Sequence, residues 1–310
     1  MFMSKSTPAT IGGQAVIEGV MMRNKKMYAM AVRAPDKSIA LVKKELSPIS
    51  NKHKLLRLPI IRGVIAFVDS FILGMEILQT SANLAGMEEE TENPSKFEQW
   101  LIKTFGDKLN DILIGISMVL GVLISVSLFM LLPVFISSFL NPWIGDNTWL
   151  LSFIEGFVRI LLFILYIHFI SRMEDMKRIF AYHGAEHKTI NCYENNEPLT
   201  VENVRKHTRL HKRCGTSFLL IVMLVSMITF MFVRTDVVWL RFALRILFVP
   251  FIAGFSFEII KWAGKSEGKL VDIISYPGML MQKLTTSEPT DDQIEIAISA
   301  MNEVLIDENK

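Results

Sequence analysis

The sequence predicts an α-helical membrane protein with four transmembrane helices and a cytoplasmic α+β portion. Hydrophobic residues make up 51% of the 310 positions, a share that favours a membrane protein over a soluble one. Four apolar stretches each reach or approach the roughly 20 residues that a helix needs to cross the hydrocarbon core. They are residues 112–140, 149–170, 216–233 and 239–260. The distribution of Lys and Arg indicates which ends of these spans face the cytoplasm.

Residues 1–57 are predicted to form a cytoplasmic N-terminal region that contains β-structure. No secretory signal is expected, because no apolar core follows the start of the chain. Two apolar segments, 27–33 and 38–46, flank the turn-like sequence APDK and suit a β-hairpin. The first strands of the protein are therefore expected before the first apolar span.

A glycine-rich segment, GGQAVIEGVMMR, occupies residues 12–23. Its three glycines permit unusual backbone angles around Gln14, Glu18 and Arg23, which we take as candidate site residues. Two interpretations remain open. The segment forms either a ligand-facing loop, or a tight turn before a strand with solvated polar side chains.

Residues 58–86 are predicted to form an interfacial or re-entrant helix. Arg62, Asp69 and Glu76 are spaced by seven and so lie near one helical face. A charge at bilayer depth costs about 2.5 to 3.5 kcal/mol, so a fifth span is disfavoured. Residues 87–111, which begin with an acidic stretch, are expected to be a linker and an amphipathic segment.

The two pairs of spans, 112–170 and 216–260, are joined by a segment that we expect to be a cytoplasmic loop, residues 171–215. This segment is basic, as are the regions before the first span and after the fourth, whereas residues 141–148 contain no Lys or Arg. Cytoplasmic segments carry the excess of Lys and Arg, so both termini are assigned to the cytoplasm. The expected partner is the lipid bilayer. A net charge of +2 gives no specific support for nucleic-acid binding.

The C-terminal region, residues 261–310, is expected to contain an amphipathic helix. Pro277 and Gly278 are expected to interrupt the chain after the fourth span. Thr290 and Gln293 fit a capping box that opens the helix. Its apolar stripe is expected to pack against the cytoplasmic region, with docking of a protein partner as the alternative.

The strongest functional clue is an H-x-x-E-H arrangement formed by His183, Glu186 and His187. On a helix these three residues share a face. The two imidazoles could then bind one cation while Glu186 acts as the catalytic base on its water. The spacing also occurs by chance, and Gly184 lowers helix propensity by about 1 kcal/mol relative to Ala.

Further candidate metal ligands lie in two other segments that can reach the same membrane face. His211 and Cys214 precede the third span, and Glu258 lies near the cytoplasmic end of the fourth. This mixture of donors suits Zn(II) best among divalent metals, although iron, cobalt and nickel are compatible with it. A purely structural interpretation is the alternative. In it, His211 belongs to a basic interfacial helix, Cys214 is a small residue at a helix start, and Glu258 lies at the boundary between membrane and water.

The sequence has two cysteines, Cys192 and Cys214. Thiols stay reduced in the cytoplasm, so no disulfide is expected. Cys192 is interpreted as incidental, and His207 as part of a basic interfacial helix.

Five segments together resemble one family over nearly the whole chain, from Gly12 to about Val304. They are GGQAVIEGVMMR, YHGAEHKTINCYE, LTVENVR, RCGTSF and KLTTSEPTDDQIEIAISA. The chain resembles the YqhQ-like family of bacterial membrane proteins, a group of unknown function whose members are labelled metal-dependent enzymes. The resemblance implies a bacterial cytoplasmic membrane location and a metal site.

Two sets of candidate residues match motifs of this family: His183, Glu186, His187, His211 and Cys214 in the histidine motifs, and Gln14, Glu18 and Arg23 in the glycine-rich segment. Family members commonly read H-P-R-C-G-T where this chain has Lys212 in place of the proline. The loss of proline loosens the local backbone.

The leading hypothesis is a metal-dependent enzyme, with hydrolysis as the candidate reaction, acting on a membrane-proximal substrate at the cytoplasmic face. The alternative is a non-enzymatic membrane adaptor or biogenesis factor that binds a protein partner. A third hypothesis, transport of an ion or small solute, requires Glu155, His168 and Glu258 to face one pathway.

Overall fold

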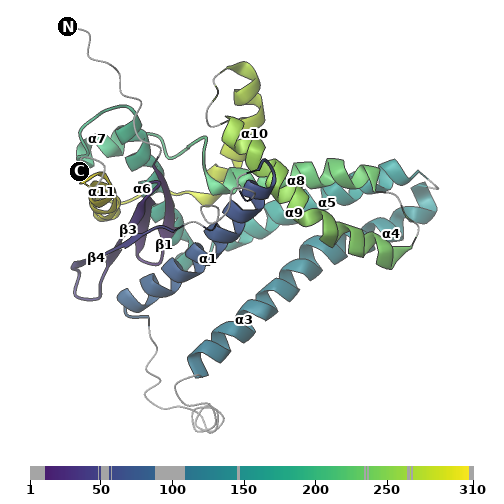
Figure 1. The fold of residues 1–310 in the computed structure, drawn as a ribbon, viewed down its shortest axis with the longest axis horizontal. Helices are drawn as coiled ribbons and strands as arrows, with labels where there is room; N and C mark the ends of the chain where they lie inside the picture. The colour runs from purple at the N-terminus through teal and green to yellow at the C-terminus, as the bar shows by residue number, and fades with distance from the viewer. Residues whose placement is uncertain are drawn as a thin grey trace.

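The computed structural model describes residues 11–47, 49, 56, 58–87, 109–144, 147–233, 235, 237–263, 266 and 268–306. The protein is mostly helical, with one small antiparallel sheet at one end and long apolar helices that extend from it (Figure 1). Most of the predicted linker, residues 87–111, lies outside the described residues, as do residues 1–10 and 307–310.

The sheet has four strands in the order β1-β2-β3-β4. They are β1 (Gly12–Val16), β2 (Gly19–Arg23), β3 (Met27–Arg33) and β4 (Ile39–Glu45). The predicted hairpin is confirmed, because Met30 of β3 pairs with Val42 of β4. The glycine-rich segment is not a ligand-facing loop. It forms β1 and β2, joined by a tight turn in which Glu18 has a φ of 53°.

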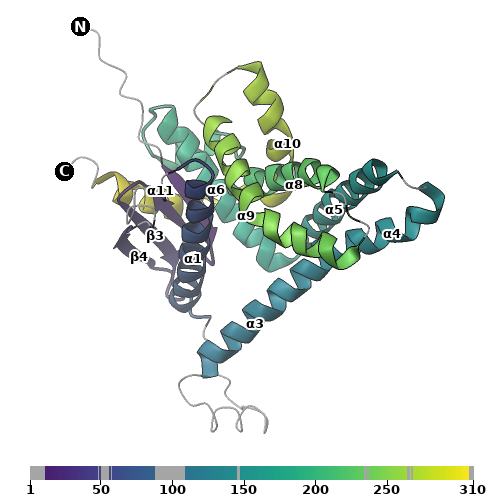
Figure 2. The same ribbon diagram turned by 45° about the vertical axis from the view of Figure 1, so that its right-hand side comes forward.

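Both faces of the sheet are covered by helices. On one face, α1 (Ile61–Leu84) places Ile77 against a cluster that includes Val16 and Met30. On the other face, Val20 and Met22 pack with residues of α6 (Glu174–Glu194) and α11 (Asp291–Ile306). The sheet is therefore the middle layer between α1 and the α6–α11 pair (Figure 2).

The predicted helix over 58–86 is confirmed as α1, which joins the sheet to the apolar helices. Glu76 accepts a hydrogen bond from Lys44 Nζ of β4 at 2.5 Å. At the other end, Gly63 packs so closely on Gly254 of α9 (Val238–Ala263) that an added Cβ would lie 2.8 Å from the Gly254 Cα. Close backbone contact of this kind is available to glycine alone.

Within the described ranges, four helical stretches are long and apolar enough to cross a membrane: Gly115–Leu140, Trp149–Ile170, Gly215–Phe232 and Phe242–Ala263. They belong to α3 (Leu109–Val126) with η4 (Ser127–Leu131) and α4 (Leu132–Ile144), to α5 (Thr148–Ile170), to α8 (Gly215–Phe232) and to α9 (Val238–Ala263). The first of these stretches contains the π-helical turn η4, which ends two residues before Pro133.

The segment expected to be a loop, residues 171–215, contains two helices instead, α6 and the short α7 (Val201–Lys206). Gly184 lies in the middle of α6, where a Cβ would clash with the backbone carbonyl of Ser287. Tertiary packing thus favours glycine here and offsets its low helix propensity.

The expected interruption at Pro277 and Gly278 is wrong, because α10 (Lys269–Thr285) continues through both residues. Gly278 lets α10 approach α8, since a Cβ there would lie 2.6 Å from the Ser217 Cβ. Packing of α10 on α8 offsets the loss of the helical hydrogen bond that Pro277 cannot donate.

One half of the predicted capping box forms at the start of α11, where Gln293 Oε1 accepts from the Thr290 N–H at 3.0 Å. The apolar stripe of α11 is buried against the sheet and α6, with Ile294, Ala297 and Met301 all in one core cluster. This packing matches the first of the two expectations for α11, and it leaves little apolar surface on this helix for a partner.

Candidate metal centre

Two histidines and one cysteine meet where the sheet-containing end joins the apolar helices. His183 and His187 lie one turn apart on α6, and their ring centroids are 4.4 Å apart. Cys214 is the N-cap residue of α8, one of the membrane-length helices. The Thr216 N–H donates to the Cys214 Sγ at 3.4 Å.

The His183 ring is oriented by α10. Its Nδ1 lies 2.8 Å from the Thr285 backbone carbonyl oxygen. A carbonyl only accepts hydrogen bonds, so Nδ1 carries the proton and Nε2 keeps a free lone pair. This Nε2 lies 3.3 Å from the Cys214 Sγ.

The His187 ring is oriented in the same way by a different segment. Its Nδ1 lies 2.6 Å from the Arg209 backbone carbonyl oxygen, which again leaves Nε2 without a proton in the neutral ring. Burial lowers the pKa of His187, and a contact with Cys214 opposes that shift. The neutral imidazole, which is the form that binds metal, is therefore favoured.

The donor atoms of His183, His187 and Cys214 all lie within 4.8 Å of one another. For tetrahedral zinc with Zn–N near 2.0 Å and Zn–S near 2.3 Å, two such ligands lie about 3.5 Å apart. The observed 3.3 Å between His183 Nε2 and Cys214 Sγ is close to that value. Metal-bound histidines typically donate their second ring N–H to a carbonyl or carboxylate, as both rings do here.

His211 lies beside this cluster but outside it. Its ring centroid is 5.7 Å from that of His187, and its Nε2 is 3.4 Å from Glu194 Oε2. Its backbone is held by Gln282, whose Oε1 accepts from the His211 N–H at 2.8 Å and whose Nε2 donates to the His211 carbonyl at 2.7 Å. Burial lowers the pKa of His211, against an opposing effect of Glu186.

Glu186 is buried between α6 and β1. A Cβ on Gly13 would lie 2.7 Å from the Glu186 Oε1, so the absence of a side chain at Gly13 makes room for this carboxyl group. Burial raises the pKa of Glu186, whereas His183, His211 and the backbone of Ala15 act to lower it. The carboxyl group is thus within electrostatic reach of two candidate ligands.

The three polar residues of the glycine-rich segment, Gln14, Glu18 and Arg23, contact the flanking helices and not the His–His–Cys cluster. Glu18 pairs with Arg178 and lies 3.3 Å from the Tyr182 hydroxyl, both on α6. Burial is the main cause that raises the pKa of Tyr182 to about 12. Gln14 and Arg23 are on the opposite face of β1 and β2, toward α1. These residues join the sheet to its flanking helices.

On that face, the Gln14 amide lies against Gly74 of α1. Burial lowers the pKa of Arg23, and the charge of Asp69 opposes this shift. Asp69 in turn accepts a hydrogen bond from the Ile49 N–H at 3.2 Å. Neither Gln14 nor Arg23 belongs to the group of possible metal ligands found among the described residues.

Glu258 is also outside that group, because Arg62 of α1 binds its carboxylate through two guanidinium nitrogens. An ion pair with α1 explains how a carboxylate lies within this membrane-length helix. Glu155, which the transport hypothesis would place on the same pathway, instead pairs with Arg159 and Arg245.

Four contributors to the site were not predicted from the sequence. They are the backbone carbonyls of Thr285 and Arg209, the Gln282 amide and the Glu194 carboxylate. A backbone carbonyl carries no signal in the sequence, since every residue has one. Glu194 ends the histidine-containing motif segment and also pairs with Arg213, so its spacing of two helical turns from His187 was the available clue.

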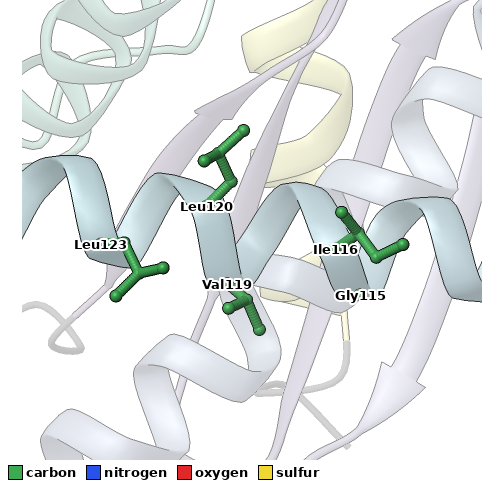
Figure 3. A pocket seen from close by; sticks show the side chains of 5 residues that line it. All are labelled: Gly115, Ile116, Val119, Leu120 and Leu123. Atoms are coloured by element: carbon green, nitrogen blue, oxygen red, sulfur yellow. The ribbon is translucent and has the colours of Figure 1, made fainter.

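A hollow of the described surface lies along α3, away from this cluster (Figure 3). It has a volume of about 490 Å³ and is lined by Gly115, Ile116, Val119, Leu120 and Leu123. None of these residues offers a polar side chain. The hollow suits contact with lipid chains and has no part in the candidate metal centre.

Together, the fold and the cluster define a mostly helical protein with four membrane-length helices and a His–His–Cys group of possible metal ligands at their junction with a small sheet. The chain belongs to the family described as Protein of unknown function (DUF1385), which matches residues 58–307. It is 38% identical over 305 residues to Uncharacterized protein YqhQ of Bacillus subtilis (strain 168), covering 98% of this chain and 95% of that protein. The membership expected from the motifs is thereby confirmed. No solved structure matches the chain.

Proposed function

We propose that this protein is a zinc-dependent hydrolase of the bacterial cytoplasmic membrane, with its site at the cytoplasmic face. The observation that carries the proposal is the matched orientation of two rings. His183 and His187 each direct Nδ1 to a backbone carbonyl, and the donor atoms that remain lie close to the Cys214 thiol. A histidine with a purely structural role would not require its second ring nitrogen to point toward other metal-ligand atoms.

The proposed topology has four spans, formed by α3 with α4, by α5, by α8 and by α9. It is supported by the basic segments on one side and by residues 141–148, which contain no Lys or Arg. Cys214 precedes α8 directly, and three residues separate the end of α5 from the start of α6. The metal centre would therefore lie at the membrane surface, within reach of a membrane-proximal substrate.

In this proposal His183, His187 and Cys214 hold the metal. Three protein ligands leave one tetrahedral position open, as in catalytic rather than structural zinc sites. When bound, zinc supplies a Lewis acid that polarises a carbonyl or phosphoryl group and acidifies water. Glu186 is the proposed proton acceptor, because it is buried beside the ligands and its raised pKa suits proton transfer closer to neutral pH.

The neighbouring groups would support these roles. Gln282 fixes the backbone of His211, and Glu194 holds the His211 ring next to His187. His211 would then be an outer group that orients substrate or stabilises charge. Hydrolysis is favoured because an open zinc position next to a buried carboxyl group requires no further cofactor.

Elemental mass spectrometry on full-length protein purified in detergent tests the metal. We expect zinc to be lost in His183→Asn and His187→Asn but retained in His168→Asn, a matched histidine change on α5, with folding checked by size-exclusion chromatography. A well-folded wild type that takes up no zinc after supplementation would refute the metal centre.

A second measurement separates the metal from the reaction. Glu186→Gln should retain zinc and lose hydrolysis across a panel of ester, amide and phosphoester substrates presented in detergent micelles. Zinc-loaded wild type that hydrolyses none of the panel would leave a metal site and remove the hydrolase assignment.

A further inference from the structure

A second set of metal-ligand side chains lies at the far end of α6. It consists of Cys192 in the last turn of α6, Glu197 in the connection to α7, and His207 at the C-cap of α7. We propose that these three residues form a second divalent-metal site, which clips the end of α7 to α6. The Sγ, carboxylate oxygen and ring nitrogen lie within 4.8 Å of one another.

The His207 ring nitrogen gives the first argument. Its Nε2 lies 3.3 Å from Glu197 Oε2, yet it is buried and makes no hydrogen bond of acceptable geometry within the described part of the chain. A buried nitrogen without a proper partner requires an explanation. A cation between the ring and the carboxylate would provide it.

The Cys192 thiol gives the second argument. Its Sγ is fully buried, and its neighbours are the carbonyl oxygens of Glu197 at 3.8 Å and Pro198 at 3.6 Å. A thiol is a weak donor, and these distances are long. The sulfur therefore has no strong partner that a metal would have to displace.

The connection between α6 and α7 brings the carboxylate to the other two ligands. Asn196 adopts a left-handed conformation with a φ of 57°, and the Glu197 N–H bonds back to the Cys192 carbonyl at 3.2 Å. The Glu197 side chain is 44% exposed whereas that of His207 is 14% exposed. The carboxylate thus gives a metal ion a path from solvent to two buried donors.

The chemistry of the donors selects the metal. Thiolate, imidazole and carboxylate together suit Zn(II) and exclude a preference for the oxygen-seeking ions Mg²⁺ and Ca²⁺. Binding would release the thiol proton of Cys192.

The position of this site gives it a structural role. The chain that follows His207 contains Arg209, whose carbonyl orients His187, and Thr208 and Leu210, whose carbonyls accept from the Asn191 amide at 2.7 Å and 3.2 Å. A metal at His207 would fix the start of the segment 208–210 to α6. Its influence on His187 rests on the proposed function of the first site, whereas metal binding at Cys192, Glu197 and His207 does not.

Thiol protection in the full-length protein, purified in detergent, distinguishes the two sites because each contains one cysteine. Alkylation of Cys192 and Cys214 by a maleimide is followed by peptide mass spectrometry, with zinc or with a chelator. At free zinc of ten times the dissociation constant, occupancy should slow alkylation by about tenfold. We expect zinc to protect Cys192 in wild type and His183→Asn, but not in His207→Asn.

Cys214 should show the reverse pattern, with protection in His207→Asn and loss of protection in His183→Asn. Elemental analysis should find one zinc fewer in Cys192→Ser than in wild type. Equal alkylation of Cys192 with zinc and with chelator, or unchanged zinc content in Cys192→Ser, would overturn the second site. Failure of the first site alone would instead appear as unprotected Cys214 beside protected Cys192.

Discussion

The Nε2 of His183 lies 3.3 Å from the Sγ of Cys214, although the two residues are 31 positions apart and belong to different helices. The contact joins α6, which packs on the sheet, to the first turn of α8, a membrane-length helix. The candidate metal centre therefore depends on how these two parts of the molecule are packed. Any change that separates α6 from α8 should weaken metal binding without altering a ligand.

Gly13→Ala should destabilise the protein and displace Glu186. The added Cβ would lie 2.7 Å from the Glu186 carboxyl, and an overpacked site of this kind costs about 1–3 kcal/mol. Thermal unfolding followed by size-exclusion chromatography measures the loss. Gly115→Ala is the matched control, because a Cβ at Gly115 meets nothing within 4 Å. Equal melting temperatures for the two variants would contradict the packing of β1 on Glu186.

Gln282→Ala should be among the most destabilising changes near the site. The Gln282 side chain is fully buried and satisfies both the N–H and the carbonyl of His211. A buried polar group that loses its partner costs about 1–3 kcal/mol. Urea unfolding in detergent should show this loss, whereas Gln79→Ala, at an exposed position of α1, should change stability little. A mild effect at Gln282 would mean that water replaces the amide.

Glu186→Gln should stabilise the metal-free protein at neutral pH. Burial raises the pKa of Glu186 in the folded state, so the folded state binds a proton more tightly than the unfolded state. The stability that this carboxyl contributes is present below the ordinary glutamate pKa of about 4.3 and is lost as pH rises through the raised value. Glu186→Gln cannot ionise, so the variant does not lose this stability as pH rises.

The advantage of Glu186→Gln should therefore shrink as pH falls toward about 4.3. Melting temperatures from pH 4 to pH 8 in the presence of a chelator measure the difference. Glu202→Gln, an exposed change on α7, should show no such trend. A Glu186→Gln variant that is less stable than wild type at neutral pH would mean that the ionised carboxyl is well paired.

Arg62→Ala should destabilise the protein more than the double change Arg62→Ala/Glu258→Ala. Arg62 binds the Glu258 carboxylate, and its removal leaves that carboxylate unpaired within a membrane-length helix, which is more costly than the absence of both charges. A double-mutant cycle on thermal stability gives the coupling. Additive effects of the two single changes would exclude this ion pair between α1 and α9.

Zinc binding should release protons from thiols. A metal-bound cysteine is a thiolate, so Cys214→Ser should release about one proton fewer than wild type when zinc is added, as measured with a pH indicator in weak buffer. His187 should contribute little above neutral pH, because burial lowers its pKa and neutral imidazole is the ligand. Identical proton release by Cys214→Ser and wild type would remove this thiol from the first site.

Local patterns made the main elements predictable. The four apolar stretches, the hairpin that became β3 and β4, and the capping box of Thr290 and Gln293 each depend on residues close in the sequence. The histidine motif was likewise found from its spacing alone. Hydropathy and helical periodicity are properties of neighbouring residues, and for this reason the linear sequence displays them directly.

Long-range packing decided the remainder. Gly184 was expected to weaken a helix, but the approach of the Ser287 carbonyl makes glycine the residue that fits there. Glu258 was expected to bind metal, but Arg62, 196 positions away, holds it.

Cys192 was interpreted as incidental and His207 as part of a basic interfacial helix, but the connection between α6 and α7 brings the two side chains together. The sequence by itself determined which segments are apolar and which are rich in candidate ligands. The tertiary structure decided which ligands meet, because pairing depends on contacts between distant segments and on backbone carbonyls that every residue carries.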